Sequence, residues 1–130
     1  MWKRIAAVGV SAGALVATAL IGAAPASATS SHYATNPKGQ ANAGFGEFDS
    51  STNTFYACDT LADSYGVKVD WYVVPYPANN GYVWARGGAG SCASQQASIN
   101  PNREVAYRIC FTGAGGFEEG CTGWFYDYSS

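Results

Sequence analysis

Two segments of the chain alternate apolar and polar side chains with a period of two. They are residues 67–74 (VKVDWYVV) and residues 105–111 (VAYRICF). A period of two places successive side chains on opposite faces of a β-strand. Both segments are therefore predicted to be strands with one buried face, on which Trp71 and Tyr107 lie. After residue 28, no window of ten residues has helical periodicity.

Shorter strand-like segments fill the rest of the chain, separated by Gly, Asn and Pro. Rich in β-branched and aromatic residues, they cover 52–58, 82–86, 117–126 and, more weakly, 94–99. Pro75 and Pro77 are expected to end the strand at 67–74, with a turn at Asn79-Asn80-Gly81. Six or seven short antiparallel strands of this kind predict an all-β fold, an immunoglobulin-like β-sandwich, with a Greek-key barrel as the alternative.

The first 28 residues have the features of a cleavable secretory signal peptide. Lys3 and Arg4 precede an uncharged apolar run over residues 5–24, and Ala26-Ser27-Ala28 supplies the small-x-small pattern of a cleavage site. A membrane anchor is the alternative, but the run is rich in Ala and Gly and the cleavage pattern follows it. We expect a secreted, extracellular chain with a flexible leader at 29–43 and a β-sandwich domain at 44–130.

Four cysteines follow the signal peptide, and an even number in a short exported chain predicts two disulfides. Gly115-Gly116 can adopt the positive φ that the centre of a two-residue hairpin turn requires. With these two residues at the turn, Cys110 lies directly opposite Cys121 on the paired strand. By elimination, the second disulfide is Cys58–Cys92.

The same hairpin register pairs apolar side chains on the other face of the two strands. It places Tyr107 opposite Trp124 and Val105 opposite Tyr126. Because successive side chains alternate between faces, we expect these pairs in the core and the Cys110–Cys121 disulfide on the opposite face.

The charge of the chain narrows the classes of partner. Residues 29–130 contain five Lys or Arg and nine Asp or Glu, a formal net charge of −4. Binding to nucleic acid or to an anionic membrane needs a basic surface, so neither partner is expected. We expect a monomer. The single histidine, His32, lies in the predicted leader, and no cysteine pair has zinc-ligand spacing, so no zinc or cofactor is expected.

The carboxylates do not form a recognisable catalytic or metal-binding motif. Asp59 and Asp63 flank a tight loop, where they either ligate calcium or cap turns; calcium needs about six to eight oxygens, so we expect capping and no metal. Glu118 and Glu119 are adjacent and, on a strand, point to opposite faces, so they cannot act together on one substrate. With no nucleophile motif either, the chain is predicted not to be an enzyme.

Three segments resemble a family of small exported actinomycete proteins. They are CDTLADSYGVKVDWY at 58–72, GSC at 90–92, and VAYRICF with GCTGW between 105 and 124. Members are similar in having an Ala-rich signal, a CDxxAD turn and a final C…CxxW hairpin, although Ser64 stands where they usually have Gly. These motifs are structural, so the resemblance implies export and fold, and it implies no catalytic residues.

Aromatic side chains exceed what a domain of this size can bury. Three Trp, nine Tyr and six Phe lie in residues 29–130. Tyr and Trp at a surface make rigid contacts with proteins and sugars. We therefore predict a secreted, non-enzymatic binding module for a protein or a glycan, with Tyr72, Tyr76, Tyr82 and Trp84 as candidate binding residues. The alternative is an inhibitor of an extracellular amylase or protease, with Trp71-Tyr72 or the loop Gly87–Ser91 as its reactive segment.

Overall fold

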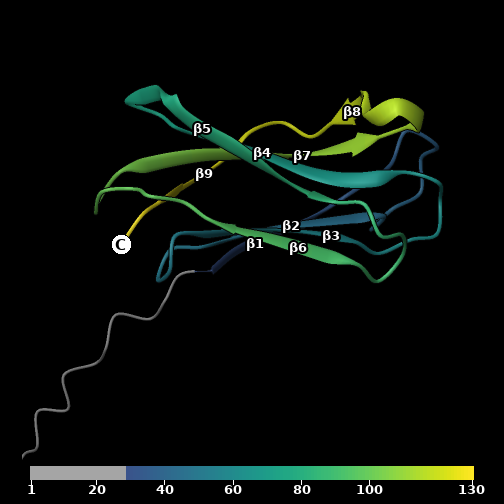
Figure 1. Cartoon of the computed structure of the whole chain (residues 1–130), viewed down its shortest axis with the longest axis horizontal. Helices are drawn as coiled ribbons and strands as arrows, with labels where there is room; N and C mark the ends of the chain where they lie inside the picture. Colours follow the sequence, from purple (N-terminus) through teal and green to yellow (C-terminus); the bar gives the residue numbers. More distant parts are fainter. Residues whose placement is uncertain (1–28) are drawn as a thin grey trace, which may run out of the picture.

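Two antiparallel β-sheets pack face to face between residues 29 and 130, the part of the chain that the computed structural model describes (Figure 1). The predicted signal peptide, residues 1–28, lies outside the described residues. The all-β sandwich predicted from the sequence is confirmed. It contains nine strands in the described residues, instead of six or seven.

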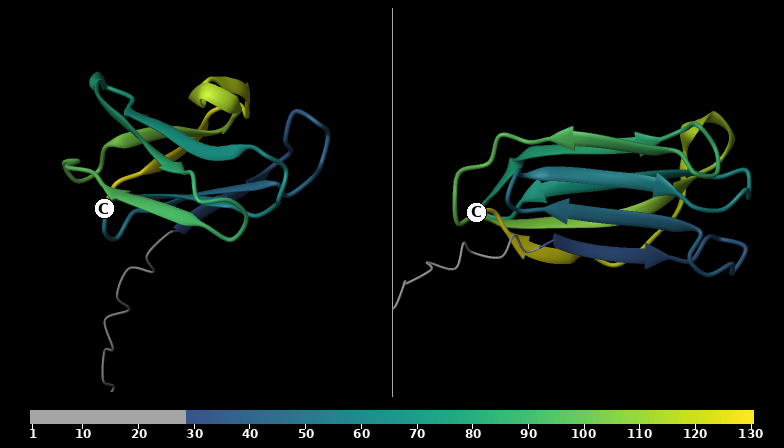
Figure 2. Two further views of the ribbon diagram at one scale, coloured as in Figure 1. Left: turned by 45° about the vertical axis from the view of Figure 1, so that its right-hand side comes forward. Right: turned by 90° about the horizontal axis from the view of Figure 1, so that it is seen from below.

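Sheet A has the strand order β1-β2-β3-β6, and it is seen from below in Figure 2. Its strands are β1 Thr29–Ala34, β2 Gly44–Asp49, β3 Thr54–Asp59 and β6 Cys92–Gln96. Sheet B has the order β5-β4-β7-β8, with β9 also paired to β7. Its strands are β4 Gly66–Val73, β5 Tyr76–Ala85, β7 Glu104–Thr112, β8 Glu118–Cys121 and β9 Phe125–Tyr128, and a 3₁₀ turn at Ala114–Gly116 joins β7 to β8.

The chain crosses between the sheets from β3 to β4, from β5 to β6 and from β6 to β7. These crossings place β6 beside β3 and β7 beside β4, so strands far apart in the sequence become neighbours in both sheets. The predicted disulfides are confirmed, and each joins neighbouring strands of one sheet. Cys58–Cys92 links β3 to β6, and Cys110–Cys121 links β7 to β8.

Aromatic rings from both sheets form the centre of the core. Phe55 of β3 stacks on Trp71 of β4 with ring centroids 4.9 Å apart, and it also meets Tyr107 of β7 edge-on. The Trp71 indole is 5% exposed, and its Nε1 donates a hydrogen bond of 3.1 Å to Gln95 on sheet A. The predicted burial of Trp71 and Tyr107 is therefore confirmed.

Residues 29–34 form an ordered strand, where the sequence predicted a flexible leader. The strand β1 pairs with β2 along its whole length, from Thr29↔Asp49 to Ala34↔Gly44. Contacts distant in sequence hold it: the His32 ring stacks on Phe125 at 3.7 Å. The following turn is also anchored, because the buried Asn36 donates from Nδ2 to Asp63 at 2.7 Å.

The predicted turn at Asn79-Asn80-Gly81 is wrong, since these residues lie inside β5. The chain reverses earlier, between Val73 and Tyr76, and the pairing register shifts between Tyr72 and Val73. Because β5 is the edge strand of sheet B, Pro77 fits within it without interrupting a hydrogen-bonded ladder on both sides.

The predicted hairpin register is correct at the disulfide and wrong beyond it. Cys110 pairs with Cys121, and Gly115 and Gly116 have φ of +82° and +80°. Further along, Tyr107 pairs with Phe125, one residue later than predicted, and the Val105 partner is likewise Asp127 instead of Tyr126.

Thr122 explains the slip of one residue. Its backbone N–H donates to the Ile109 carbonyl at 2.8 Å, and its Oγ1 accepts from the Ile109 N–H at 3.0 Å. Thr122 therefore satisfies both backbone groups of Ile109, its N–H and its carbonyl, without the regular pairing of two strands. One extra residue is accommodated there before β9 begins, and this shifts the register. Trp124, predicted in the core, is therefore 36% exposed and lies on the same face as the disulfide, against Arg108.

Candidate binding face on sheet B

The outer face of sheet B points away from sheet A. It carries three of the four aromatic side chains that the sequence suggests for binding, together with a group of charged side chains. Alternation along β4 and β7 sends the apolar residues inward and their neighbours outward. Three neighbouring strands supply these outward residues. They are Lys68, Asp70 and Tyr72 on β4, Arg108 and Cys110 on β7, and Tyr82 and Trp84 on the edge strand β5.

Four charged side chains form a closed ion-pair cluster at the centre of this face. Lys68 Nζ lies 3.2 Å from Asp70 and 2.9 Å from Glu118. Arg108 Nη2 lies 3.2 Å from Asp70 and 3.4 Å from Glu118. Two cations and two carboxylates balance, and the register explains the proximity because Asp70 and Arg108 are direct cross-strand partners.

The cluster separates the pKa values of its two carboxyl groups. Burial, followed by the nearby Glu118, raises the pKa of Asp70 against the opposing effect of Lys68. Burial also acts to raise the pKa of Glu118, but hydrogen bonds from Lys68 and Asp70 and the charges of Lys68 and Arg108 outweigh it and lower that pKa. Asp70 is therefore the more easily protonated of the two.

A groove of about 380 Å³ lies beside this cluster; we call it the Tyr82–Trp124 groove. Tyr72 and Trp124 meet edge-to-face along one side, with centroids 4.9 Å apart. The Lys68 ammonium lies over the Tyr82 ring at 4.6 Å, and the Arg108 guanidinium over Trp124 at 4.7 Å. These cations hold the rings in place, and the groove is completed by Asp70, Trp71, Pro77, Asn80 and Gly81.

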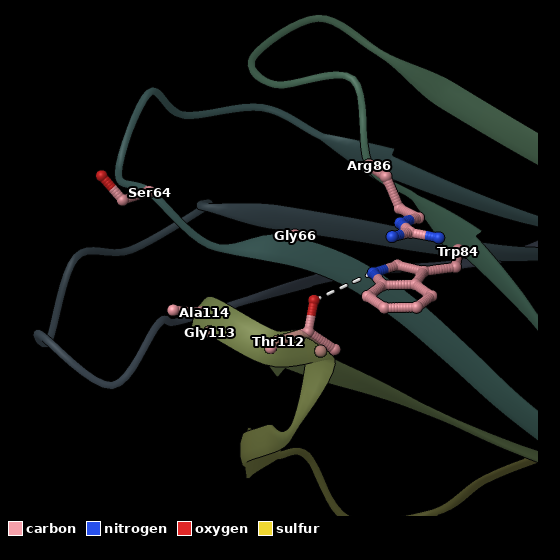
Figure 3. A pocket seen from close by; sticks show the side chains of 9 residues that line it. Ser64, Gly66, Trp84, Arg86, Thr112, Gly113 and Ala114 are labelled. Carbon is pink, nitrogen blue, oxygen red and sulfur yellow. Dashed lines mark hydrogen bonds between the residues drawn. The ribbon is translucent and has the colours of Figure 1, made fainter.

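A second hollow of about 400 Å³, the Arg86 pocket, lies at the end of β5 near the turn at Ala114–Gly116 (Figure 3). The Arg86 guanidinium lies 4.1 Å from the Trp84 ring centroid. Trp84 Nε1 donates a hydrogen bond of 2.9 Å to Thr112 Oγ1, as the dashed line in Figure 3 shows. The indole is thereby fixed between a cation and a hydroxyl group.

Three of the four predicted binding residues lie on this face: Tyr72 and Tyr82 in the groove and Trp84 in the Arg86 pocket. Tyr76 does not join them, since it lies at the start of β5 beneath the Arg103 guanidinium at 5.3 Å. Trp124 completes the groove, although the predicted register had placed it in the core. Its exposure follows from the one-residue slip at Thr122, which the pattern of side chains does not reveal.

Asp59 and Asp63 cap turns, as expected from the sequence. Asp59 Oδ1 accepts from the Leu61 N–H at 3.2 Å, and Asp63 Oδ1 accepts from the Tyr65 N–H at 3.0 Å. The other Asp63 oxygen accepts from Asn36. Both residues line a third hollow of about 420 Å³. Directly after Asp63, Ser64 has φ of +70°, a conformation in which Gly is unstrained.

Within residues 29–130, one group of side chains brings three metal-ligand atoms together: Cys110, Glu118 and Cys121. The two sulfurs are bonded to each other in the disulfide, so neither is available as a thiolate ligand. In the same part of the chain, no helix has the length and apolar character to cross a membrane.

Comparison of the chain with protein-family models, with curated proteins and with solved structures gives no match.

Proposed function

We propose that this protein is an exported, non-catalytic binding module that holds a glycan in the Tyr82–Trp124 groove. The observation that carries the proposal is the grouping of Tyr72, Tyr82 and Trp124 around the polar side chains of Asp70 and Asn80. Sugars present apolar C–H faces and hydroxyl edges. Aromatic rings suit the faces, while a carboxylate and an amide suit the hydroxyl groups.

The groove is also rigid enough for recognition without large rearrangement. Most of its side chains project from the paired strands β4 and β5, Trp124 comes from the connection between β8 and β9, and cations contact two of its rings. Preorganised side chains lower the entropy that binding costs. Tyr82 is 57% exposed and therefore open to a ligand.

Two features support export. Both disulfides are of the kind that persists in oxidising compartments, and residues 1–28 have the sequence of a signal peptide. We expect mass spectrometry of the secreted protein to give a chain that starts at Thr29 and lacks the four hydrogens of two disulfides. A secreted chain that retained residues 1–28 would contradict this.

Binding suits the central charges better than catalysis does. Asp70 and Glu118 are each ion-paired with both Lys68 and Arg108, an arrangement that balances their charges and fixes their positions. Glu119 lies elsewhere, with its carboxylate against Gly113.

The alternative, inhibition of an extracellular hydrolase, has less support from the two candidate segments. Trp71 is buried, so Trp71-Tyr72 cannot present both rings to an enzyme. The loop Gly87–Ser91 is fixed to β3 by hydrogen bonds from the Gly90 and Asp59 N–H groups, and it carries no large side chain to fill an enzyme pocket. Assays against amylases and proteases serve as the counter-test, since potent inhibition would favour this alternative.

Affinity electrophoresis and pull-down on insoluble polysaccharides test the proposal. Retardation by at least one polysaccharide is expected, with Tyr82→Ala and Trp124→Ala each weakening binding about tenfold, as truncation of a central aromatic contact does. Tyr33→Ala is the matched control, because Tyr33 is an exposed tyrosine, 60% accessible, on sheet A. Absence of glycan binding, or equal loss in the Tyr33→Ala protein, would contradict the proposal.

A further inference from the structure

The Tyr82–Trp124 groove and the Arg86 pocket are neighbours along one strand. Asn80, Tyr82 and Trp84 lie at alternate positions on the outer side of β5, and Arg86 follows at the next alternate position. Alternate residues of a strand are about 6.6 Å apart, so the row spans about 20 Å. One linear ligand of a few linked rings can therefore reach both hollows.

The Arg86 pocket offers hydrogen-bond donors to a ligand. Arg86 is exposed, and among residues 29–130 the ion pairs belong to Lys68 and Arg108, so the Arg86 guanidinium has no carboxylate partner there. Stacking on Trp84 occupies a face of the guanidinium and leaves its N–H groups at the edge.

The buried Thr112 hydroxyl supplies a second, independent donor. Thr112 is 2% exposed, lines the pocket and accepts the Trp84 Nε1–H. A hydroxyl that accepts one bond keeps its own proton to donate, and no acceptor for that proton lies among the described side chains.

Glycines keep this pocket open. A Cβ at Gly66 would lie 2.6 Å from Thr112 Oγ1 and 2.9 Å from Trp84 Nε1. A Cβ at Gly116 would lie 2.6 Å from the Trp84 ring. Side chains at either position would displace the indole or cover the hydroxyl group, so the arrangement of donors depends on both glycines.

We propose that the glycan is acidic and that the Arg86 pocket binds a sugar carboxylate while the Tyr82–Trp124 groove binds a neighbouring ring. This inference rests on the proposed function. The planar guanidinium of Arg86 can donate two parallel N–H bonds to a carboxylate. The Thr112 hydroxyl, which lines the same pocket, supplies a further donor. The four charges of the central cluster cancel, which leaves Arg86 as the available cation at this end of the face.

Calorimetry with a galacturonic acid hexamer and its methyl ester tests the inference. The ester keeps the rings and removes the charge. We expect the free acid to bind the wild-type protein about tenfold more tightly than the ester. Arg86→Gln should abolish this preference by weakening binding of the free acid much more than binding of the ester. Arg86→Lys, which keeps the charge without the planar fork, should restore part of it.

Two charge variants serve as controls. Lys38→Gln removes one positive charge at an exposed site beside Tyr65, where Lys38 Nζ donates to the Asp63 carbonyl and does not line the Arg86 pocket, and it should leave the preference intact. Glu119 packs against Gly113 beside the pocket, so Glu119→Gln removes a repelling charge and should increase the affinity for the acid. A general electrostatic effect would instead make Lys38→Gln resemble Arg86→Gln.

The outcomes separate the two proposals. Equal affinity for acid and ester across galacturonate, mannuronate and glucuronate oligomers would overturn the acidic-glycan inference, while groove-dependent binding of the esters would leave the proposed function standing. Failure of every acidic and neutral glycan to bind would reject both. Tighter binding of peptides with a free C-terminal carboxylate than of any uronate would also reject the inference.

Discussion

The Tyr107 hydroxyl joins the two sheets through Ser30. It donates a hydrogen bond of 3.1 Å to the Ser30 carbonyl oxygen, and its oxygen lies 2.6 Å from Ser30 Oγ, which is placed to donate in return. Burial raises the pKa of Tyr107 to about 12, against a lowering by Ser30, so the hydroxyl stays protonated at neutral pH. Edge strand β1 is thereby tied to the centre of sheet B.

Tyr107→Phe removes this link while retaining the ring in the core. The Ser30 carbonyl loses this donor and the Ser30 hydroxyl keeps only His32 Nε2 at 3.4 Å, so we expect a loss of about 1–2 kcal/mol in the free energy of unfolding. Urea titration measures it, with Tyr33→Phe as a control, because the Tyr33 ring is exposed. Hydrogen exchange in β1 should accelerate in the Tyr107→Phe protein alone. Unchanged stability and exchange would show that Ser30 does not anchor β1.

Phe125→Ala should destabilise the protein more than Trp124→Ala does. Phe125 packs between His32 at 3.7 Å and Tyr107 at 5.6 Å, whereas Trp124 lies on the outer face. Removal of a half-buried Phe leaves a cavity and is expected to cost about 2–3 kcal/mol, and truncation of the exposed Trp about 1 kcal/mol. Thermal unfolding of both variants gives the order. The reverse order would support the register first predicted from the sequence.

The two disulfides should differ in their contribution to stability. Their cysteines are 34 and 11 residues apart for Cys58–Cys92 and Cys110–Cys121. In the chain-entropy model the longer loop stabilises by about 4 kcal/mol and the shorter by about 3 kcal/mol. Paired Cys→Ala variants, unfolded in urea, should show this order. A larger loss from the Cys110/Cys121 pair would indicate that contacts in the folded state outweigh loop entropy.

Asp59→Asn should stabilise the protein increasingly as the pH rises. Burial and the charge of Asp63 raise the pKa of Asp59, against the Leu61 N–H, so the folded state favours the protonated carboxyl. That contribution is present below the pKa of the unfolded chain and is lost as the pH rises through the folded value. Asn keeps the acceptor for Leu61 and carries no charge. Between about pH 3 and about pH 7, the free energy of unfolding of the variant should therefore rise relative to that of the wild type, as measured by unfolding curves at each pH.

Asp49→Asn provides the control of opposite sign. Hydrogen bonds from Ser51 lower the pKa of Asp49, so its contribution to stability is present above the unfolded pKa and is lost as the pH falls through the folded one. The free energy of unfolding of this variant should therefore decrease relative to that of the wild type as the pH rises. Parallel pH profiles for both variants would mean that neither carboxyl interacts as described.

Local patterns predicted part of this fold, and non-local contacts decided the rest. The alternation around Trp71 and the glycines before Cys121 are local signals, so β4, β7 and the Cys110–Cys121 pair could be predicted. The polar strand β1 carries no such signal, because Ser30 and His32 find their partners on strands distant in sequence.

The residues of the candidate binding face could be predicted only in part, because their grouping also depends on contacts between strands distant in sequence. Tyr72, Tyr82 and Trp84 could be named as candidate binding residues because the chain has more aromatic residues than its core can bury. The ion-pair cluster could not be predicted, since it depends on Asp70 facing Arg108 across β4 and β7. The role of Trp124 depends on how Thr122 bonds to Ile109, which is a matter of backbone register and not of residue type.

Both disulfides lie within a sheet, which has a mechanical consequence. The sheets can be pulled apart without breaking a covalent bond, because the connecting loops, the core and side-chain hydrogen bonds such as Tyr107–Ser30 hold them together, and no disulfide joins them. A chain stretched from its ends keeps the 34 and 11 residues between its bridged cysteines out of the extended length. At about 3.5 Å per residue, the fully extended length of the oxidised chain is about 160 Å less than that of the reduced chain.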